Sequence, residues 1–294
     1  MAVARFQFVC DESYDSDPQK GGGSFFLTES RGSIYVPKTY LLAGFFGHEL
    51  TWDDVATRWN AVNGWAGVTR YHAAYVNARA GEFSGWAKEK QIEYSKRLLQ
   101  VILDHAGLVH VVSVGMEANE YYSTINEFGR RKLGSPYIAC FKSLVSVIAH
   151  QMELGTAGFA PDDQFDFILD QNGNEEGGAI EMFYTMKSDR AWPFAHRLGD
   201  CGAASAERYI PLQCADMIAY ESFRLVQDQN TGARIRKGLE LMFPTNPFLG
   251  YMYDRNAFNQ LKIPLESAIT CIDNGFVTNF PMVTQPMDAQ GNPL

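Results

Sequence analysis

The first strand-like segment of the chain runs directly into two acids. Between Ala4 and Cys10 apolar and polar side chains alternate, and Asp11 and Glu12 follow at once. An alternation with a period of two predicts a β-strand with one buried face. Burying an anion without a partner costs several kcal/mol, and no Lys or Arg stands in the immediate sequence neighbourhood of Asp11. The segment therefore predicts both a core strand and a site that needs a counter-charge.

Further strand and helix patterns follow along the chain. Apolar, β-branched runs predict strands, and apolar residues at helical spacing behind capping residues such as Thr51 and Ser135 predict helices. The expected strands cover residues 24–28, 40–46, 108–116 and 165–170, and the expected helices begin near residues 51, 86, 135 and 211. Three early strands followed by alternating helices and strands predict an α/β protein with a mixed sheet and helices packed on its faces.

The chain has 294 residues, enough for one elaborated domain. We expect residues 1–230 to form the main domain and residues 231–280 to form a helical extension packed on it. Residues 281–294 contain three prolines and are expected to be an extended or mobile tail.

Composition excludes several classes of protein. Hydrophobic residues make up 46% and charged residues 20%, which rules out global disorder. There is no run of eighteen apolar residues, so no membrane span is expected, and the N-terminus lacks the apolar core of a signal peptide. The five cysteines are widely spaced without a CxxC pair, which argues against a structural zinc site and a disulfide framework. The expected location is a reducing cytoplasm.

Acids occupy two further places where the sequence is otherwise apolar. The strand-like segment that begins at Phe165 ends in Asp170. In the helix that opens with Pro211, Gln213 and Asp216 are three residues apart and share a face. Two acids at strand ends and one on a late helix can converge at one edge of a sheet. Mg²⁺ or Mn²⁺, which take oxygen ligands, would be an adequate counter-ion.

Each acid also has an ordinary explanation. A turn residue that hydrogen-bonds its own backbone explains Asp170 alone equally well. Asp216 could be hydrogen-bonded to the preceding chain. In a regular strand Glu12 points to the face opposite Asp11, and it joins Asp11 only if the strand has already ended. Only the combination of the acids points to a metal site.

Four ordered segments carry a resemblance to a known family. They are Phe8–Ser13 with Asp-Glu-Ser, Tyr71–Tyr75 with a His motif followed by Gly81–Trp86, Phe167–Asp170, and Tyr209–Tyr220 with Pro-Leu-Gln-Cys-Ala-Asp. This set resembles DUF3800, a family of bacterial and phage proteins with suspected nuclease activity. The resemblance implies a ribonuclease-H-like fold, with a mixed β-sheet, helices on both faces and family-specific insertions.

The chain departs from the family pattern in two places. Tyr14 stands where the family usually has Gly, and a polar insert, residues 15–24, follows it. Because Gly permits close backbone approach, Tyr14 alters how a substrate or metal would reach the site. Gln171 stands where an acid is common in relatives, which removes one candidate ligand charge.

The resemblance implies two-metal hydrolysis of phosphodiester bonds, in which carboxylates hold two cations about 3.5–4 Å apart. Asp11 would bridge the Mg²⁺ or Mn²⁺ ions, and Asp170 and Asp216 would each complete one side. Glu12 and Glu117 are the contenders for a fourth carboxylate.

Two polar residues are candidates for supporting roles in such a site. Gln213 would orient Asp216 or a ligand water through a hydrogen bond, without binding the metal itself. His72 is a candidate general base or phosphate contact, because imidazole titrates near neutral pH. A polar residue in a loop or at a helix start explains His72 equally well.

The net charge of −9 argues against a protein that coats nucleic acid. Clustered metal-binding carboxylates account for part of that charge. The leading prediction is a divalent-metal-dependent nuclease acting on DNA or RNA. The alternatives are a non-catalytic binding or scaffolding module on the same fold and a metal-dependent hydrolase of a small phosphorylated molecule.

Overall fold

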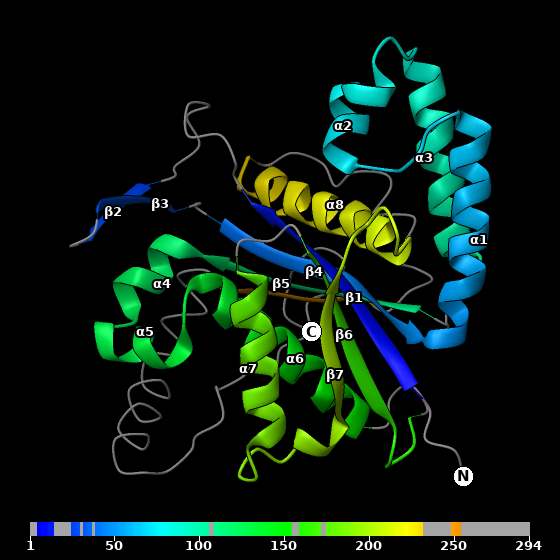
Figure 1. The fold of residues 1–294 in the computed structure, drawn as a ribbon. Coiled ribbons are helices and arrows are strands. Elements are labelled where there is room, and N and C mark those ends of the chain that lie inside the picture. Colours follow the sequence, from blue (N-terminus) through cyan, green and yellow to red (C-terminus); the bar gives the residue numbers. More distant parts are fainter. Residues whose placement is uncertain are drawn as a thin grey trace.

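The computed structural model describes residues 5–14, 25–29, 32–36, 39–105, 109–154, 159–171, 175–231 and 248–253. Within these ranges six strands form one sheet, in the order β7-β6-β1-β4-β5-β8 (Figure 1). They are β1 (Arg5–Tyr14), β4 (Thr39–His48), β5 (Val109–Glu117), β6 (Gln164–Asp170), β7 (Leu198–Ala204) and β8 (Phe248–Tyr253). A separate two-stranded sheet contains β2 (Phe25–Glu29) and β3 (Gly32–Val36).

The sheet is mixed in direction. Strand β4 is antiparallel to both β1 and β5, whereas β6 is parallel to β1 and β7 is parallel to β6. Strand β8 extends the other edge, parallel to β5. The prediction of an α/β protein with a mixed sheet and helices on its faces is confirmed.

The alternation in β1 assigns its side chains to two hydrophobic cores. Phe8 and Cys10 lie in the core on one face of the sheet, and Val9 lies in the core on the other. The neighbouring strand β6 follows the same rule, with Phe167 in the first core and Ile168 packed against the second. Both faces of the central strands are therefore buried.

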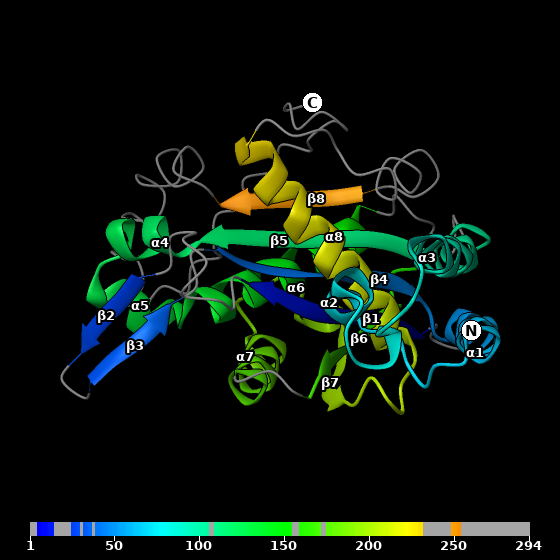
Figure 2. The same cartoon turned by 90° about the horizontal axis from the view of Figure 1, so that it is seen from above.

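Helices cover both faces of the sheet (Figures 1 and 2). On the face of Phe8, α6 (Pro136–Glu153) and α7 (Glu176–Ser188) contribute to the first core. On the face of Val9, α8 (Pro211–Thr231) crosses β1 and β4 and contributes to the second. Shorter helices are α4 (Ala118–Thr124), α5 (Glu127–Leu133) and η2 (Ala195–Arg197).

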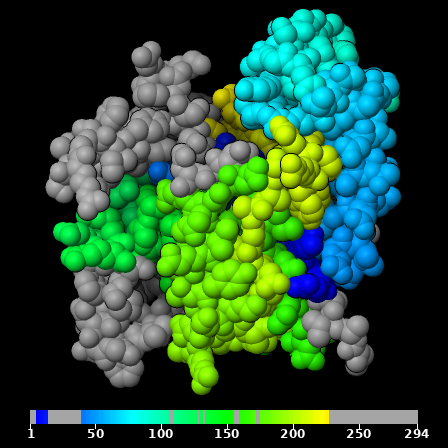
Figure 3. All heavy atoms as spheres, viewed as in Figure 1, coloured from blue at the N-terminus to red at the C-terminus, as the bar shows by residue number. Residues whose placement is uncertain are grey.

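The segment between β4 and β5 forms a group of helices beside α8, which we call the helical lobe (Figure 3). It contains α1 (Glu49–Ala66), α2 (Ala73–Ala78), η1 (Gly81–Phe83) and α3 (Lys88–Leu103). Trp59 of α1 and Tyr94 of α3 are fully buried in it. The Tyr94 hydroxyl donates a hydrogen bond of 2.7 Å to Asn63, which joins α3 to α1.

Several element boundaries differ from those predicted. Strand β1 continues to Tyr14 because its pairing with β4 extends to Tyr40, so Asp11 lies inside the strand and not at its end. Helix α1 begins before Thr51: its cap is His48, whose Nδ1 accepts the N–H of Leu50 at 3.2 Å. The cap predicted at Ser135 is confirmed, since its hydroxyl accepts the N–H of Ile138.

The C-terminal region holds a strand where a helical extension was expected. Residues 248–253 form β8, because they pair with β5 from Val111 to Met116, along the edge of β5 that is not paired with β4. The remainder of residues 232–280, the predicted tail 281–294 and the insert 15–24 lie outside the described residues.

Strands β1 and β4 approach each other very closely at Gly44, which is paired with Cys10. A Cβ atom at this position would lie 1.9 Å from the backbone oxygen of Val9 and 2.7 Å from the Cα of Cys10. Glycine is therefore needed there to keep the two strands together directly before Asp11.

Candidate carboxylate site

Asp11 and Asp170 lie next to each other on adjacent parallel strands. The pairing of β1 with β6 reaches Cys10 and Leu169, and the two acids follow these residues directly. Since side chains alternate along a strand, Asp11 and Asp170 point to the same face as Val9 and Ile168, which is the face that α8 covers. The two strand acids therefore face the helix that carries Asp216.

The pKa of Asp11 shows how close these groups lie. Burial raises the pKa of this carboxyl well above its usual value, and the charges of Asp216, Glu12 and Asp170, in decreasing order, raise it further. The backbone N–H of Glu12, which donates to Asp11 at 2.8 Å, acts in the opposite direction. The charges that act on Asp11 thus come from β1, β6 and α8, and ionising all of these carboxylates together costs free energy.

Glu12 lies on the opposite face of the sheet from Asp11, because β1 is still regular at this point. Its pKa is raised from 4.5 to about 7 by burial, by Asp170, and by two acids of the α7 start, Glu176 and Glu175. Burial raises the pKa of Tyr137 on α6, and the charge of Glu12 is the next largest cause of this increase. Glu12 therefore connects the predicted trio to a second group of acids.

Glu175 and Glu176 were not predicted as part of the site. Glu175 is the N-cap residue of α7 and Glu176 lies in its first turn. Acids are favoured at helix starts, and the turn-prone Asn-Gly-Asn before them is a sequence signal for such a start. These two residues lie four and five positions after Gln171 in the sequence, and their charges act on Glu12.

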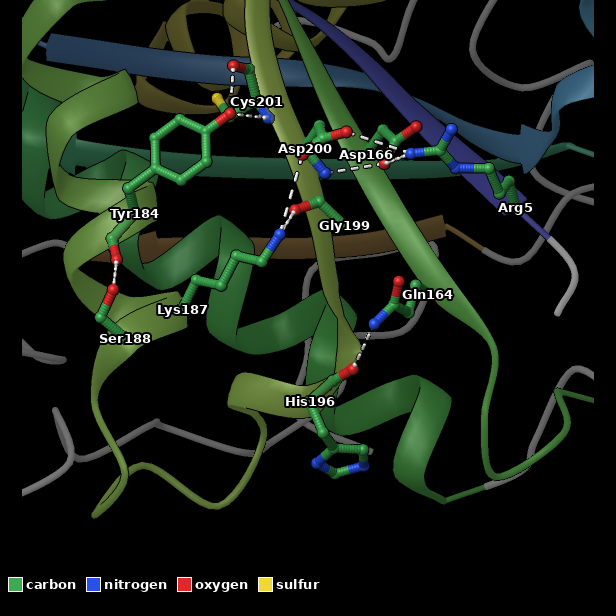
Figure 4. Close-up of polar contacts among 10 residues, drawn as sticks. All are labelled: Arg5, Gln164, Asp166, Tyr184, Lys187, Ser188, His196, Gly199, Asp200 and Cys201. Carbon is green, nitrogen blue, oxygen red and sulfur yellow. Dashed lines mark hydrogen bonds and ion pairs between the residues drawn. The ribbon is translucent and has the colours of Figure 1, made fainter.

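The other end of β6 provides a comparison. There Asp166 lies 3.5 Å from the guanidinium of Arg5, and Asp200 lies 3.1 Å from Arg5 and 3.7 Å from Lys187 (Figure 4). The backbone N–H of Asp200 also donates to Asp166 at 2.8 Å. Asp166 is thus matched with a cation near the start of β6, whereas the charges that act on Asp11 of β1 are those of carboxylates.

Asp216 is held against the segment that carries His72. Its Oδ2 accepts the backbone N–H of Ala73 at 2.8 Å and lies 3.3 Å from Nδ1 of His72. The His72 ring is tilted against the ring of Tyr75, with 4.4 Å between the centroids. His72, predicted near the site from the family resemblance, lies in direct contact with Asp216.

Gln213 is fully buried, and its hydrogen bonds go to groups other than Asp216. Its Oε1 accepts from Nε1 of Trp59 at 3.1 Å, from Nδ2 of Asn63 at 3.2 Å and from the backbone N–H of Tyr71 at 2.8 Å. Its Nε2 donates to the carbonyl of Ala206 at 2.8 Å. Gln213 therefore joins α8 to the helical lobe, and it fixes the backbone at Tyr71, two residues before the N–H that Asp216 accepts.

Replacing Gln213 by Ala is expected to lower the free energy of unfolding by about 3–5 kcal/mol, because three buried donors lose their acceptor. Urea denaturation followed by circular dichroism measures the change. Gln100→Ala is the matched control, since this exposed amide donates only to Asp104 on the surface of α3, and its effect should stay within about 0.5 kcal/mol. If Gln213→Ala lowered the free energy of unfolding by less than about 1 kcal/mol, the three hydrogen bonds that Gln213 accepts would not contribute to stability as proposed.

Glu117 lies apart from the other acids. Through the pairings of β1 with β4 and of β4 with β5, Asp11 is level with Ala43 and Ser113, and Glu117 is four residues beyond Ser113. At about 3.3 Å per residue and about 4.8 Å per strand, the two backbones are separated by roughly 13 Å along the strands and about 10 Å across them. Glu117 is also absent from the charges that act on Asp11. Neither contender for a fourth carboxylate therefore joins the trio: Glu117 is too distant, and Glu12 points to the opposite face because β1 continues past it.

The groups whose charges act on Asp11 are carboxylates, and carboxylate oxygens are the ligands that Mg²⁺ and Mn²⁺ prefer. The chemistry of these groups therefore fits a divalent cation. In the described ranges, however, no three or more His, Cys, Asp or Glu side chains lie together in a geometry that could hold a metal ion.

None of the helices in the described part of the chain combines the length and the apolar character required to cross a membrane. Searches against protein-family models, curated proteins and solved structures found no match to this chain.

Proposed function

We propose that this protein is a divalent-metal-dependent nuclease that hydrolyses phosphodiester bonds by a two-metal mechanism. The observation that carries the proposal is the placement of Asp11 and Asp170 at neighbouring positions of the parallel strands β1 and β6, on the face covered by the helix of Asp216. Burial and the charges of Asp216, Glu12 and Asp170 raise the pKa of Asp11 there. Clusters of strongly perturbed ionisable groups are typical of functional sites. A fold gains no stability from gathering like charges, so their proximity favours a role in binding a cation.

The topology supports a ribonuclease-H-like fold as part of this proposal. Three antiparallel strands, β1, β4 and β5, come first, and β6 and β7 then extend the sheet in parallel on the other side of β1. This arrangement, with helices on both faces, agrees with the fold that the resemblance to DUF3800 implies.

In the proposed mechanism Asp11, Asp170 and Asp216 would hold the cations, with Asp11 as the ligand that they share. Bound Mg²⁺ or Mn²⁺ would supply an activated water and stabilise the leaving oxygen. Glu12, on the opposite face of the sheet, adds negative charge that favours cation binding, and the charges of Glu175 and Glu176 act on Glu12. Asp216 keeps its orientation through the N–H of Ala73, and His72 beside it can contact a phosphate or the attacking water.

The proposal is tested by incubating the purified chain with single-stranded DNA, duplex DNA, RNA and RNA–DNA hybrid in Mn²⁺, Mg²⁺ or EDTA. We expect cleavage of at least one of these in Mn²⁺ or Mg²⁺, none in EDTA, and none by an Asp11→Ala control. Absence of cleavage of all four substrates by the wild-type chain, at metal concentrations that saturate binding in calorimetry, would contradict the proposal. Hydrolysis of a small phosphorylated compound under the same conditions would then show that the protein is a hydrolase of small phosphorylated molecules.

A further inference from the structure

Tyr75 on α2 is an aromatic residue with an unusually open position next to the candidate site. Its side chain is 47% exposed, although the neighbouring residues Ala73 and Val76 are buried. One side of its ring lies against His72, with an interplanar angle of 31°. A Cβ at position 81 would lie 3.3 Å from Cδ2 of Tyr75, so Gly81 leaves the ring less covered than any other residue would.

This aromatic pair is held firmly beside the carboxylates. The backbone N–H of Tyr71 donates to Gln213, and that of Ala73 donates to Asp216, so both sides of His72 are fixed to α8. Nδ1 of His72 itself lies 3.3 Å from Asp216, and the charge of Asp216 raises the pKa of Asp11. A group stacked on Tyr75 would therefore be separated from the proposed reaction centre only by His72 and Asp216.

The sequence segment that contains Tyr75 is more basic than the chain as a whole. Between Arg70 and Arg97 there are six basic and three acidic residues, in a chain whose net charge is −9. Arg79, the C-cap residue of α2, is exposed and forms no ion pair with the residues that the structure describes. Attraction between such residues and phosphate groups contributes most of the affinity of sequence-independent nucleic-acid binding.

We propose that Tyr75, backed by His72, stacks a base of a single-stranded nucleic acid whose backbone leads to the Asp11 site. This inference rests on the proposed nuclease function and narrows its substrate. An exposed ring can receive only a base that has left its own stack, and bases in a regular duplex are not available in this way. The stacking platform is indifferent to the sugar, so single-stranded DNA and RNA are both expected to bind.

The test measures fluorescence anisotropy of labelled twelve-nucleotide oligo(dT), oligo(U) and a twelve-base-pair duplex. An Asp11→Asn background in Mg²⁺ allows binding without cleavage. We expect Tyr75→Ala to weaken single-strand binding about ten-fold or more, in the range found for the loss of one stacked base, and to leave duplex binding unchanged. Tyr75→Phe should bind like the parent. Trp65→Ala is the matched control, because this aromatic is 48% exposed but lies on α1 and is covered by Arg97.

Thermal unfolding of Tyr75→Ala within about one degree of the parent would show that the variant is folded. Equal affinity of Tyr75→Ala and the parent for single strands, or equal weakening of single-strand and duplex binding, would overturn the inference. So would a Tyr75→Phe variant as weak as Tyr75→Ala, since the hydroxyl would then be the contact. Cleavage of duplex with no single-strand preference would overturn this inference and leave the nuclease function standing, whereas neither binding nor cleavage of any nucleic acid would remove both.

Discussion

Replacing Asp11 by Asn is expected to reduce metal-dependent cleavage by about a thousand-fold or more while raising the stability of the metal-free protein. Removing a shared cation ligand costs several kcal/mol of transition-state stabilisation, and each 1.36 kcal/mol corresponds to a factor of ten in rate. The stability gain has the opposite origin. Asn has nearly the same shape but carries no charge to be repelled by Asp216, Glu12 and Asp170. Initial cleavage rates and urea denaturation in EDTA measure the two effects.

Asp166→Asn provides the control for this experiment. Asp166 lies on β6, four residues before Asp170, but its charge is matched by Arg5. We expect this variant to keep its cleavage rate and to lose a little stability, because an attractive pair is removed. An Asp11→Asn variant that retained its rate within ten-fold, or that was less stable than the wild type in EDTA, would contradict the assignment of Asp11 as the central ligand.

The sequence predicts the strand part of this site well because the relevant signals are local. The alternation through Phe8 and Cys10 fixes which face each side chain of β1 occupies, and the apolar run before Asp170 does the same for β6. Parallel pairing of two such strands then brings their acids side by side on one face of the sheet. What the local pattern cannot supply is the length of β1, which depends on β4 pairing as far as Tyr40.

The environment of the acids depends on contacts that no local pattern contains. The hydrogen bond between Tyr71 and Gln213 joins residues 142 positions apart, and the spacing of Gln213 and Asp216 suggested instead that the amide would serve the acid. The approach of Glu175 and Glu176 to Glu12 likewise depends on how α7 packs after β6. A raised pKa results from such packing, so only the residue types, and not their electrostatics, could be predicted.

In EDTA the stability of the wild-type protein is expected to fall as the pH rises from 4.5 to about 7. Below pH 4.5 Glu12 is protonated in both the folded and the unfolded chain and contributes no penalty. Between 4.5 and about 7 the unfolded chain has released this proton and the folded chain still holds it, so folding becomes less favourable as the pH rises. Above about 7 the penalty is complete and amounts to at most about 3 kcal/mol. The raised pKa of Asp11 acts in the same direction.

Glu12→Gln should flatten this profile and should be more stable than the wild type at pH 8, whereas Glu89→Gln on the exposed surface of α3 should reproduce the wild-type curve. Mn²⁺ or Mg²⁺ should raise the melting temperature of the wild type clearly at pH 8 and only slightly at pH 5, because protons and cations compete for the same carboxylates. Thermal unfolding across this pH range, with metal and with EDTA, measures both effects. A cation that raises the melting temperature equally at pH 5 and pH 8, or equally in Asp11→Asn and the wild type, would have to bind elsewhere. At the carboxylates around Asp11 its effect must grow with pH, because these groups bind a cation only after they have lost their protons.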